Sequence, residues 1–397
     1  MLVSNVMLAL AAVFAGGGPA TTLYVSPDGD DAGDGSLARP FLTLTRARDA
    51  VRLIRRPLPP GGVAVHLRAG VHHIVASAAA TAVLELTAED SGAADAPIVW
   101  RAHHGEEGHV LVSAGLPVPT SAFSPVPASF SHSPGNSHVL QANLTALGAR
   151  ELGGIQEVLT PRQGGPANFS WPMSRPELFF QRRPMTLAQW PNLCGPNRSI
   201  TWAQMENTYR NAENRTVGFT FNPATQLSCP ATQPKLAEWA AEAASHDPWL
   251  HGYWQWDFAD GYIPMAALSL TGAGLPGVSV GAKIGTGFQN DASKIGARFY
   301  ALNLKSELDA VGEYYIERSN GSASARAQRG MLFFMPPPAA GELSGVIDGA
   351  FVSQLPAVIS LSNQTSFVRF EDLRLEHSTG SAVQGPGPAR AGTISSL

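Results

Sequence analysis

The chain has 397 residues, of which only 15% are charged, and its formal net charge is -4. This balance provides no basic surface for nucleic acid, so that class of partner is not expected. The 40 glycines and 31 prolines favour many turns and short strands over a helical bundle, and the length allows two compact units.

Residues 1–20 have the pattern of a secretory signal peptide. An apolar run from Val6 to Ala15 is too short to cross a bilayer, and small residues follow it, so cleavage is expected between Ala15 and Thr21. No Lys or Arg precedes the run, which leaves an uncleaved anchor or a misplaced start as alternatives. The expected localisation is secreted or extracellular.

One short amphipathic helix follows the leader. Apolar residues recur at helical spacing at Leu44, Ala47, Val51 and Ile54, with arginines on the other side. From Gly61 onward the pattern changes to β runs, so this helix is expected to cap the open end of a coil of strands.

The Asp/Gly loop before this helix favours turns with positive φ. From Asp28 to Gly33 it has the spacing of a calcium loop, but Arg39 stands where an EF-hand has Glu. An Asx-turn loop is therefore favoured over a calcium site, and no cofactor is predicted.

Short β runs separated by polar or glycine turns fill the next stretch, up to Leu116. Val63, Val65 and Leu67 alternate onto one face, and the runs HHIV, AVLELT, PIVWRA and HVLVSAG follow. Short strands at this cadence, with no long helices between them, can coil only by stacking. The fold class predicted is therefore all-β, a parallel β-helix with an N-terminal capping helix.

After Leu116 the series of short β runs gives way to a mixed pattern, which predicts an inserted β-rich unit over 117–342. It begins with a Pro/Ser linker and contains a helix at 235–244 and a hairpin formed by GEYYIE and residues 331–335. The β-helix is expected to resume over 343–397. There Val368 and Phe370 should point inward, as should Leu373 and Leu375 after a bend at 371–372. The predicted domains are thus 1–20, signal peptide; 21–116, cap and first turns; 117–342, insertion; and 343–397, resumed but incomplete turns.

Several blocks carry a family resemblance: YVSPDGDDAGDGS, PFLTLTRARDAVR, VHLRAGVHHI, LNLKSELDAVGEYYIERSNG and SFVRFEDLRLEHSTGSAV. From about Tyr24 to Val383 the chain resembles secreted right-handed parallel β-helix proteins of the pectate-lyase-like superfamily, close to glycoside hydrolase family 141. The resemblance is more specific for fold than for reaction, because this fold carries hydrolases, lyases and binding proteins. Family members continue for many more turns, so the chain resembles a C-terminally truncated member, a fragment or a degenerate paralogue.

Hydrolysis of a glycosidic bond needs two carboxyl groups, about 5 Å apart for retention or about 6.5–9.5 Å for inversion. Stacked strands lie about 4.8 Å apart, so equivalent positions on neighbouring strands can supply such a pair. Glu376 with its neighbour His377 is the catalytic candidate, with solvated turn residues as the alternative. The resemblance places the main carboxylates beyond Leu397. Acidic residues near the resumed turns are Asp348, Glu371, Asp372 and Glu376.

An aromatic block inside the insertion allows two further interpretations. Its rings could stack on sugars, but burial in the core of the insertion is favoured. A metal site is also conceivable, but the spacing of its His and Asp residues matches no tetrahedral pattern, so no metal is predicted. The aromatic residues are Trp249, Tyr253, Trp254, Trp256 and Phe258, and the possible ligands are His246, Asp247, His251, Asp257 and Asp260.

Two other features agree with export. Cys194 and Cys229 are the only cysteines, and a disulfide between them is predicted, with two inert thiols as the alternative. Six sequons exceed the number expected by chance, which predicts glycosylation. The sequons are at Asn143, Asn168, Asn197, Asn214, Asn320 and Asn363.

Three functions remain open from the sequence. The first is a glycoside hydrolase acting on a complex polysaccharide through two carboxylates, inactive if later turns are missing. The second is a non-catalytic polysaccharide-binding or cell-surface protein that uses the strand face. The third is a polysaccharide lyase, which calls for an acidic calcium site beside a base, and no such cluster is identified near Arg369 or Arg374. A glycan is the expected partner in all three.

Overall fold

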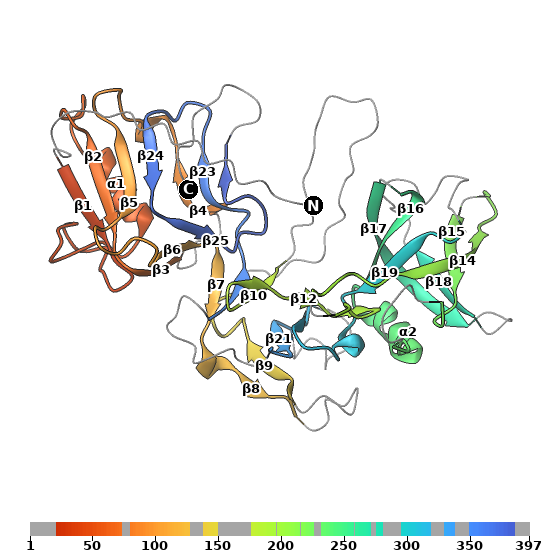
Figure 1. Ribbon diagram of the computed structural model, residues 1–397. Helices are drawn as coiled ribbons and strands as arrows, with labels where there is room; N and C mark the ends of the chain where they lie inside the picture. Colours follow the sequence, from red (N-terminus) through yellow and green to blue (C-terminus); the bar gives the residue numbers. More distant parts are fainter. Residues whose placement is uncertain are drawn as a thin grey trace.

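The computed structural model describes residues 21–73, 80–127, 138–149, 176–195, 197–214, 216–225, 232–257, 259–270, 275–280, 295–318, 329–337 and 349–385. This part of the chain is mainly β, as predicted, with two α-helices, α1 (Leu44–Arg52) and α2 (Leu236–Ser245). Figure 1 shows a group of strands around α1, a central group of small sheets, and a third group of strands beside α2.

Three sheets in the first region contain only parallel pairs. Their strand orders are β1-β2-β5-β24, β25-β6-β3 and β26-β23-β4. The strands are β1 (Thr21–Val25), β2 (Val63–Leu67), β3 (Gly70–His73), β4 (Ala82–Leu86), β5 (Ile98–Ala102), β6 (Val110–Ser113), β23 (Ala357–Leu361), β24 (Val368–Glu371), β25 (Arg374–Glu376) and β26 (Val383–Gln384).

Successive strands step from one of these sheets to the next. β2, β3 and β4 enter the three sheets in turn, β5, β6 and β23 then pair beside them, and β24, β25 and β26 repeat the order. The chain between β6 and β23 builds the other two regions. Pairing between strands this distant in sequence brings residues near 70, 112 and 375 side by side.

One apolar core lies between the three sheets and α1. Alternate residues of each strand face it, because successive side chains of a strand point to opposite faces. The bend predicted after β24 is present at Asp372, whose φ of 57° lies in the left-handed region. Each fully buried Val, Leu or Phe adds about 1.5–3 kcal/mol. The residues predicted to face inward all lie in or against this core: Val63, Val65, Leu67, Val368, Phe370, Leu373 and Leu375.

Helix α1 packs on this core as predicted. It begins after Thr43, whose Oγ1 accepts the backbone N–H of Arg46 at 3.1 Å and so satisfies a free donor of the first turn. Leu44, Ala47 and Val51 are its buried residues. The spacing of apolar residues therefore located this helix correctly, within two residues at its end.

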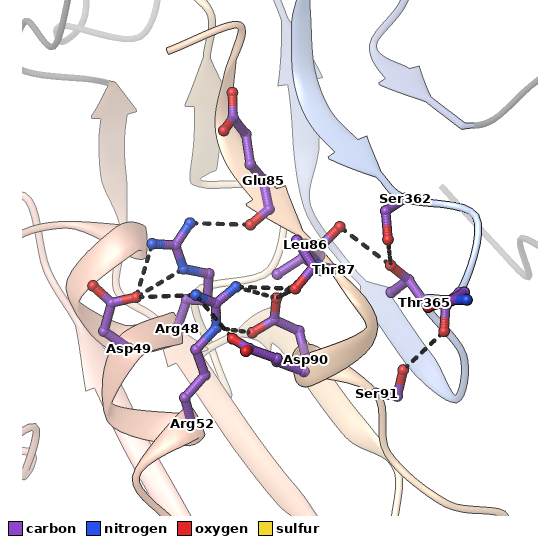
Figure 2. A network of polar contacts seen from close by, with 12 residues as sticks. Arg48, Asp49, Arg52, Glu85, Leu86, Thr87, Asp90, Ser91, Ser362 and Thr365 are labelled. Carbon is purple, nitrogen blue, oxygen red and sulfur yellow. Dashed lines mark hydrogen bonds and ion pairs between the residues drawn. The ribbon is translucent and has the colours of Figure 1, made fainter. Parts of the chain in front are cut away.

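Polar contacts fix α1 to β4 and to the 3₁₀ turn η1 (Ala88–Asp90), as Figure 2 shows. Arg52 donates from Nε and Nη2 to the Asp90 carboxylate at 2.8 and 2.7 Å. The same carboxylate accepts the backbone N–H of Thr87 at 2.7 Å. Arg48 donates to the carbonyl of Glu85 at 3.1 Å. Asp90 is only 3% exposed, so these partners supply the hydrogen bonds that water would otherwise make.

The Asp90→Ala substitution is expected to lower the free energy of unfolding by about 2 kcal/mol, because Arg52 loses a largely buried partner and Thr87 loses an acceptor. Asp49 offers a matched control, since it also contacts Arg52 but has a half-exposed side chain. Asp49→Ala should lower the free energy of unfolding by less than about 1 kcal/mol. Urea denaturation of both variants measures this difference, and equal losses would contradict it.

Two smaller sheets follow in the central region. One has the order β11-β10-β22-β7 and is antiparallel; the other, β12-β20-β21-β9-β8, is antiparallel except for β12–β20. The predicted pairing of GEYYIE with the Met331 segment is confirmed by β20 and β21. The strands are β7 (Gly115–Val118), β8 (Ser124–Pro125), β9 (Leu140–Asn143), β10 (Leu178–Phe180), β11 (Arg183–Pro184), β12 (Thr186–Leu187), β20 (Glu313–Ile316), β21 (Met331–Phe334) and β22 (Ala350–Ser353), with 3₁₀ turns η2 (Thr120–Ala122) and η4 (Lys305–Glu307).

The third region is a small antiparallel barrel, which the sequence did not predict beyond a β-rich unit. Its strands run in the order β13-β19-β14-β15-β18-β17-β16, and a further pairing of β16 with β19 closes the sheet. The strands are β13 (Gln189–Trp190), β14 (Ala203–Arg210), β15 (Thr216–Phe221), β16 (Trp249–Trp256), β17 (Ala259–Leu270), β18 (Pro276–Val280) and β19 (Arg298–Leu302).

Helix α2, predicted at 235–244, packs into the barrel core. Its Trp239 is completely buried, with its ring centroid 5.5 Å from that of Trp190 and 6.1 Å from that of Phe221. All three rings belong to the apolar cluster inside the barrel. The helix therefore supplies Trp239, one of the buried rings of the barrel core.

Some predictions fall outside the described residues, namely the signal peptide at 1–20, Asn168, Asn320 and Cys229. Cys194 is described, and its disulfide to Cys229 stays a prediction. The other sequon asparagines, Asn143, Asn197, Asn214 and Asn363, are all exposed, as glycosylation requires, and glycosylation itself stays a prediction. Among the described residues no helix has the length and apolarity needed to cross a bilayer.

Candidate functional site

A row of polar side chains crosses the outer face of the sheet that contains β25. The parallel register aligns His73 of β3, Ser113 of β6 and Glu376 of β25. Neighbouring strands lie about 4.8 Å apart, so these side chains are adjacent although they are far apart in sequence. Leu375, the residue before Glu376 on β25, points to the opposite side and packs against the core. The row therefore places the predicted Glu376 beside two residues that the sequence analysis did not select.

Glu376 is held in place by Arg374 of the same strand. The guanidinium donates from Nε at 3.1 Å and from Nη2 at 2.8 Å, both to Oε1. The side chains are 19% and 27% exposed, so the pair lies at the edge of solvent. Oε2 of Glu376 is directed toward His377 at 3.6 Å.

His377 is buried, which corrects the alternative that it is a solvated turn residue. Only 5% of it is exposed, and its ring stacks on Phe351 of β22 with centroids 4.2 Å apart. The ring centroid of Phe179, on β10, lies 4.9 Å from that of the same imidazole. The backbone adopts φ 66° here, a conformation that is uncommon outside glycine. Strands β22 and β10 of the central region, not the parallel sheets, thus cover His377.

Hydrogen bonds link the backbone of Gly115 to the ring of His377 through Ser113. The N–H of Gly115 donates to Ser113 Oγ at 3.1 Å, and that hydroxyl lies 3.0 Å from Nδ1 of His377. The Ser113 hydroxyl also donates to the carbonyl oxygen of Gly115 at 3.3 Å, in which case Nδ1 of His377 is the donor to that hydroxyl. These contacts fix the orientation of the His377 ring, with Glu376 on its outer side.

Burial lowers the pKa of His377 to about 4, with Arg374 acting in the same direction and Glu376 opposing it. The unfolded side chain titrates near 6.5, so the folded state binds fewer protons between these values. The stability that depends on neutral His377 is complete above about pH 6.5 and is lost as pH falls toward 4.

Between pH 6.5 and 4, wild type is expected to lose about 3 kcal/mol more unfolding free energy than His377→Gln, whose amide does not titrate. Urea denaturation at several pH values measures both slopes. Parallel curves for the two proteins would show that His377 is not a buried neutral residue.

Buried carboxylates form a second polar cluster where α2 meets η4 and β20. Glu242 accepts the backbone N–H groups of Lys305 and Ser306 at 2.7 and 2.8 Å, and Glu313 accepts those of Asp309 and Ala310 at 3.1 and 3.0 Å. Burial raises the pKa of both carboxyls. These contacts make the two residues supports of the loops around η4.

Glu317 in the same cluster has ionisable neighbours. Its Oε2 lies 3.3 Å from Nε2 of His246 and 3.4 Å from Nζ of Lys305, and only 1% of the side chain is exposed. His246 belongs to the predicted metal candidates, but its partner is this carboxylate. No group of three His, Cys, Asp or Glu residues suited to a metal ion occurs among the described residues. The cluster joins the barrel to the central sheets.

The aromatic block divides between the core and the outer surface of the barrel. Trp254 is buried inside the barrel and Trp249 in the central core, as favoured. Tyr253 instead lies half-buried on the outer face, beside Trp202 at 5.6 Å. The side chain of Trp256 and all of Phe258 lie outside the described residues. His251 donates to Asp260 at 2.7 Å, so these two predicted metal candidates bind each other.

In the Asp/Gly loop the acidic side chains bind the backbone. Asp30 accepts the N–H of Ala32 at 2.9 Å, the favoured Asx turn, and Asp31 accepts those of Leu42 and Thr43 at 2.9 Å each. These bonds fasten the loop to the start of α1. They give Asp31 a structural role that the sequence did not reveal.

The comparisons with known proteins bear on the fold. No protein-family profile and no curated protein matches the chain. Among solved structures, one titled "Glycoside hydrolase" aligns with 90% of this chain and 51% of its own, with a TM-score of 0.55 and 16% identity. The chain is similar in fold to that glycoside hydrolase. It spans about half of that protein's length, and at this identity the likeness concerns the fold alone.

Two further structures align less well. A "Rhamnogalacturonan lyase" aligns over 23% of this chain and 22% of its own, with a TM-score of 0.19 and 21% identity. "The complex structure of XylC with xylose" aligns over 91% of this chain and 36% of its own, with a TM-score of 0.28 and 11% identity. Nothing is inferred from either.

Proposed function

We propose that this chain is part of a secreted, carbohydrate-active protein related to glycoside hydrolase family 141. In this proposal the three parallel sheets are the first turns of a right-handed parallel β-helix, and 117–342 is a unit inserted between β6 and β23. The stepwise order of strands through the three sheets supports the coil. The shared fold with a glycoside hydrolase supports the relationship at a coarse level.

Glu376 is the residue that we propose to contact the sugar, and its position carries the proposal. It is a partly exposed carboxylate at the joint between the parallel sheets and the insertion, with Oε1 bound by Arg374. Sites of this kind, where a few fixed polar groups meet at a boundary between units, are common for ligands. Its expected role is to take a proton from a water or to accept a sugar hydroxyl.

A second candidate function is binding without catalysis. Hydrolysis needs two carboxyl groups, and in the row formed by His73, Ser113 and Glu376 only the last supplies one. A partner carboxylate on the next stacked strand would lie about 4.8 Å from Glu376, close to the spacing of retaining enzymes. A chain with Glu376 alone would bind a glycan and leave it intact.

The test is to incubate the chain with xylan, pectin and fucose-containing polysaccharides, with and without a chelator. New reducing ends without ultraviolet absorbance support the hydrolase. Unsaturated products absorbing in the ultraviolet would replace it with a lyase. Retention on a polysaccharide without cleavage would favour the binding function, and neither cleavage nor retention would refute both.

A further inference from the structure

The outer face of the barrel carries a continuous set of aromatic rings. Along β16 the residues Leu250 and Trp254 face the barrel core, so His251 and Tyr253 face outward. The register places Tyr262 of β17 and Tyr300 of β19 on either side of His251. We call this face the aromatic stripe, and it consists of Trp202, His251, Tyr253, Tyr262, Arg298 and Tyr300.

The rings of the stripe contact one another closely. The His251 ring lies 4.2 Å from Tyr262 and 4.9 Å from Tyr300. Trp202 lies 5.4 Å from Tyr300 and 5.6 Å from Tyr253. These spacings are those of favourable aromatic pairs, so the rings hold one another in fixed positions.

Burial decreases along the stripe. At one end Tyr300, 9% exposed, belongs to the core of the central region. At the other end Trp202, Tyr253 and Arg298 are only half-buried. Asp260, whose side chain is 53% exposed, stands beside them. Trp202 and Tyr262 also pack against that core, so the part of the stripe that reaches solvent is the exposed part of the half-buried Trp202, Tyr253 and Arg298.

Polar groups border the rings with both charges present. The guanidinium of Arg298 lies 4.3 Å from the Tyr253 ring centroid, and Asp260 accepts from His251 Nε2 at 2.7 Å. The hydrogen bond from His251 lowers the pKa of Asp260, so this carboxylate is ionised. His251 is 6% exposed, and its Nδ1 has no hydrogen-bond partner among the described residues.

We propose that the aromatic stripe binds a neutral polysaccharide by stacking on its sugar rings, an inference that rests on the proposed carbohydrate function. Pyranose rings present C–H faces that suit flat aromatic rings, while their hydroxyls both donate and accept hydrogen bonds. The stripe offers such a ring in Trp202, a carboxylate acceptor in Asp260 and donors in Arg298. Because Arg298 and Asp260 balance each other, the stripe has no excess charge for an acidic glycan.

The test measures retention of the full chain on insoluble xylan and mannan, with polygalacturonate as the acidic probe. Trp202→Ala should weaken retention on a neutral polysaccharide by about tenfold, the loss expected for one stacking ring. Asp260→Asn, an exposed change that should not disturb folding, is expected to weaken it by about threefold. Phe367→Ala is the matched control, since Phe367 is 54% exposed and lies on the parallel sheets.

Cleavage of short soluble oligosaccharides separates this site from Glu376. Loss of retention in Trp202→Ala with unchanged cleavage supports the stripe. Full retention in both stripe variants, or stronger retention on polygalacturonate, overturns the stripe and leaves the proposed function intact. Trp202-dependent retention without cleavage supports the stripe and refutes the hydrolase. If Trp202→Ala instead converts a dimer into a monomer, the stripe is a protein interface and the proposal fails.

Discussion

Glu376→Gln is expected to lower kcat/KM for polysaccharide hydrolysis by about 10²–10⁴-fold, the range for a lost acid–base group. Glutamine keeps the size of the side chain and can still accept from Arg374. It cannot take a proton. The variant should therefore fold normally and bind substrate with little change in KM. The loss of kcat/KM should then appear in kcat.

Glu371→Gln is the matched control for that experiment. Glu371 is a carboxylate of similar exposure on the neighbouring parallel sheet, paired with Arg101 at 3.5 Å. It should retain at least half of wild-type activity. Equal losses in the two variants, or full activity in Glu376→Gln, would remove Glu376 from the proposed site.

Trp239→Ala is expected to destabilise the barrel by about 3–5 kcal/mol, the usual cost of removing a large buried aromatic side chain. The substitution empties the space between Trp190 and Phe221. It also removes the indole N–H that donates to Glu307 at 2.6 Å, which leaves a buried carboxylate with one partner fewer. Trp239→Phe keeps an aromatic ring at this position and should destabilise the barrel clearly less.

Hydrogen exchange resolves where this loss occurs, which a single unfolding curve of a chain with several units does not. Protection should fall in the barrel strands β14 to β19 and stay near the wild-type level in β2 and β5. A uniform loss over both regions would show that α2 stabilises the whole chain and not the barrel in particular.

Local patterns in the sequence predicted the features that depend on neighbours along the chain. Helical spacing located α1, the helix predicted at 235–244 is α2, and alternation gave the inward faces of β2, β24 and β25. The pair of acidic residues at the end of β24 marked the bend, where Asp372 takes the left-handed conformation. Each of these signals lies within about ten residues, where periodicity and turn chemistry are decisive.

The candidate site was only partly visible in this way. Glu376 and His377 were selected from the sequence, whereas His73 and Ser113 were not, since only strand stacking makes them neighbours of Glu376. In the sequence, alternation could only mark every second residue of β3 and β6 as facing outward, which includes His73 and Ser113. Without the strand register that signal could not single out these two residues.

The sequence alone determined that this chain forms short strands around a buried apolar face, with a helix packed against it, because side-chain periodicity is a local property. Tertiary structure decided the burial of His377, since Phe351 and Phe179 come from strands β22 and β10 of the central region. It also decided the closure of the barrel, which depends on the pairing of β16 with β19. Contacts between residues so distant along the chain leave no periodic trace, so only the folded arrangement reveals them.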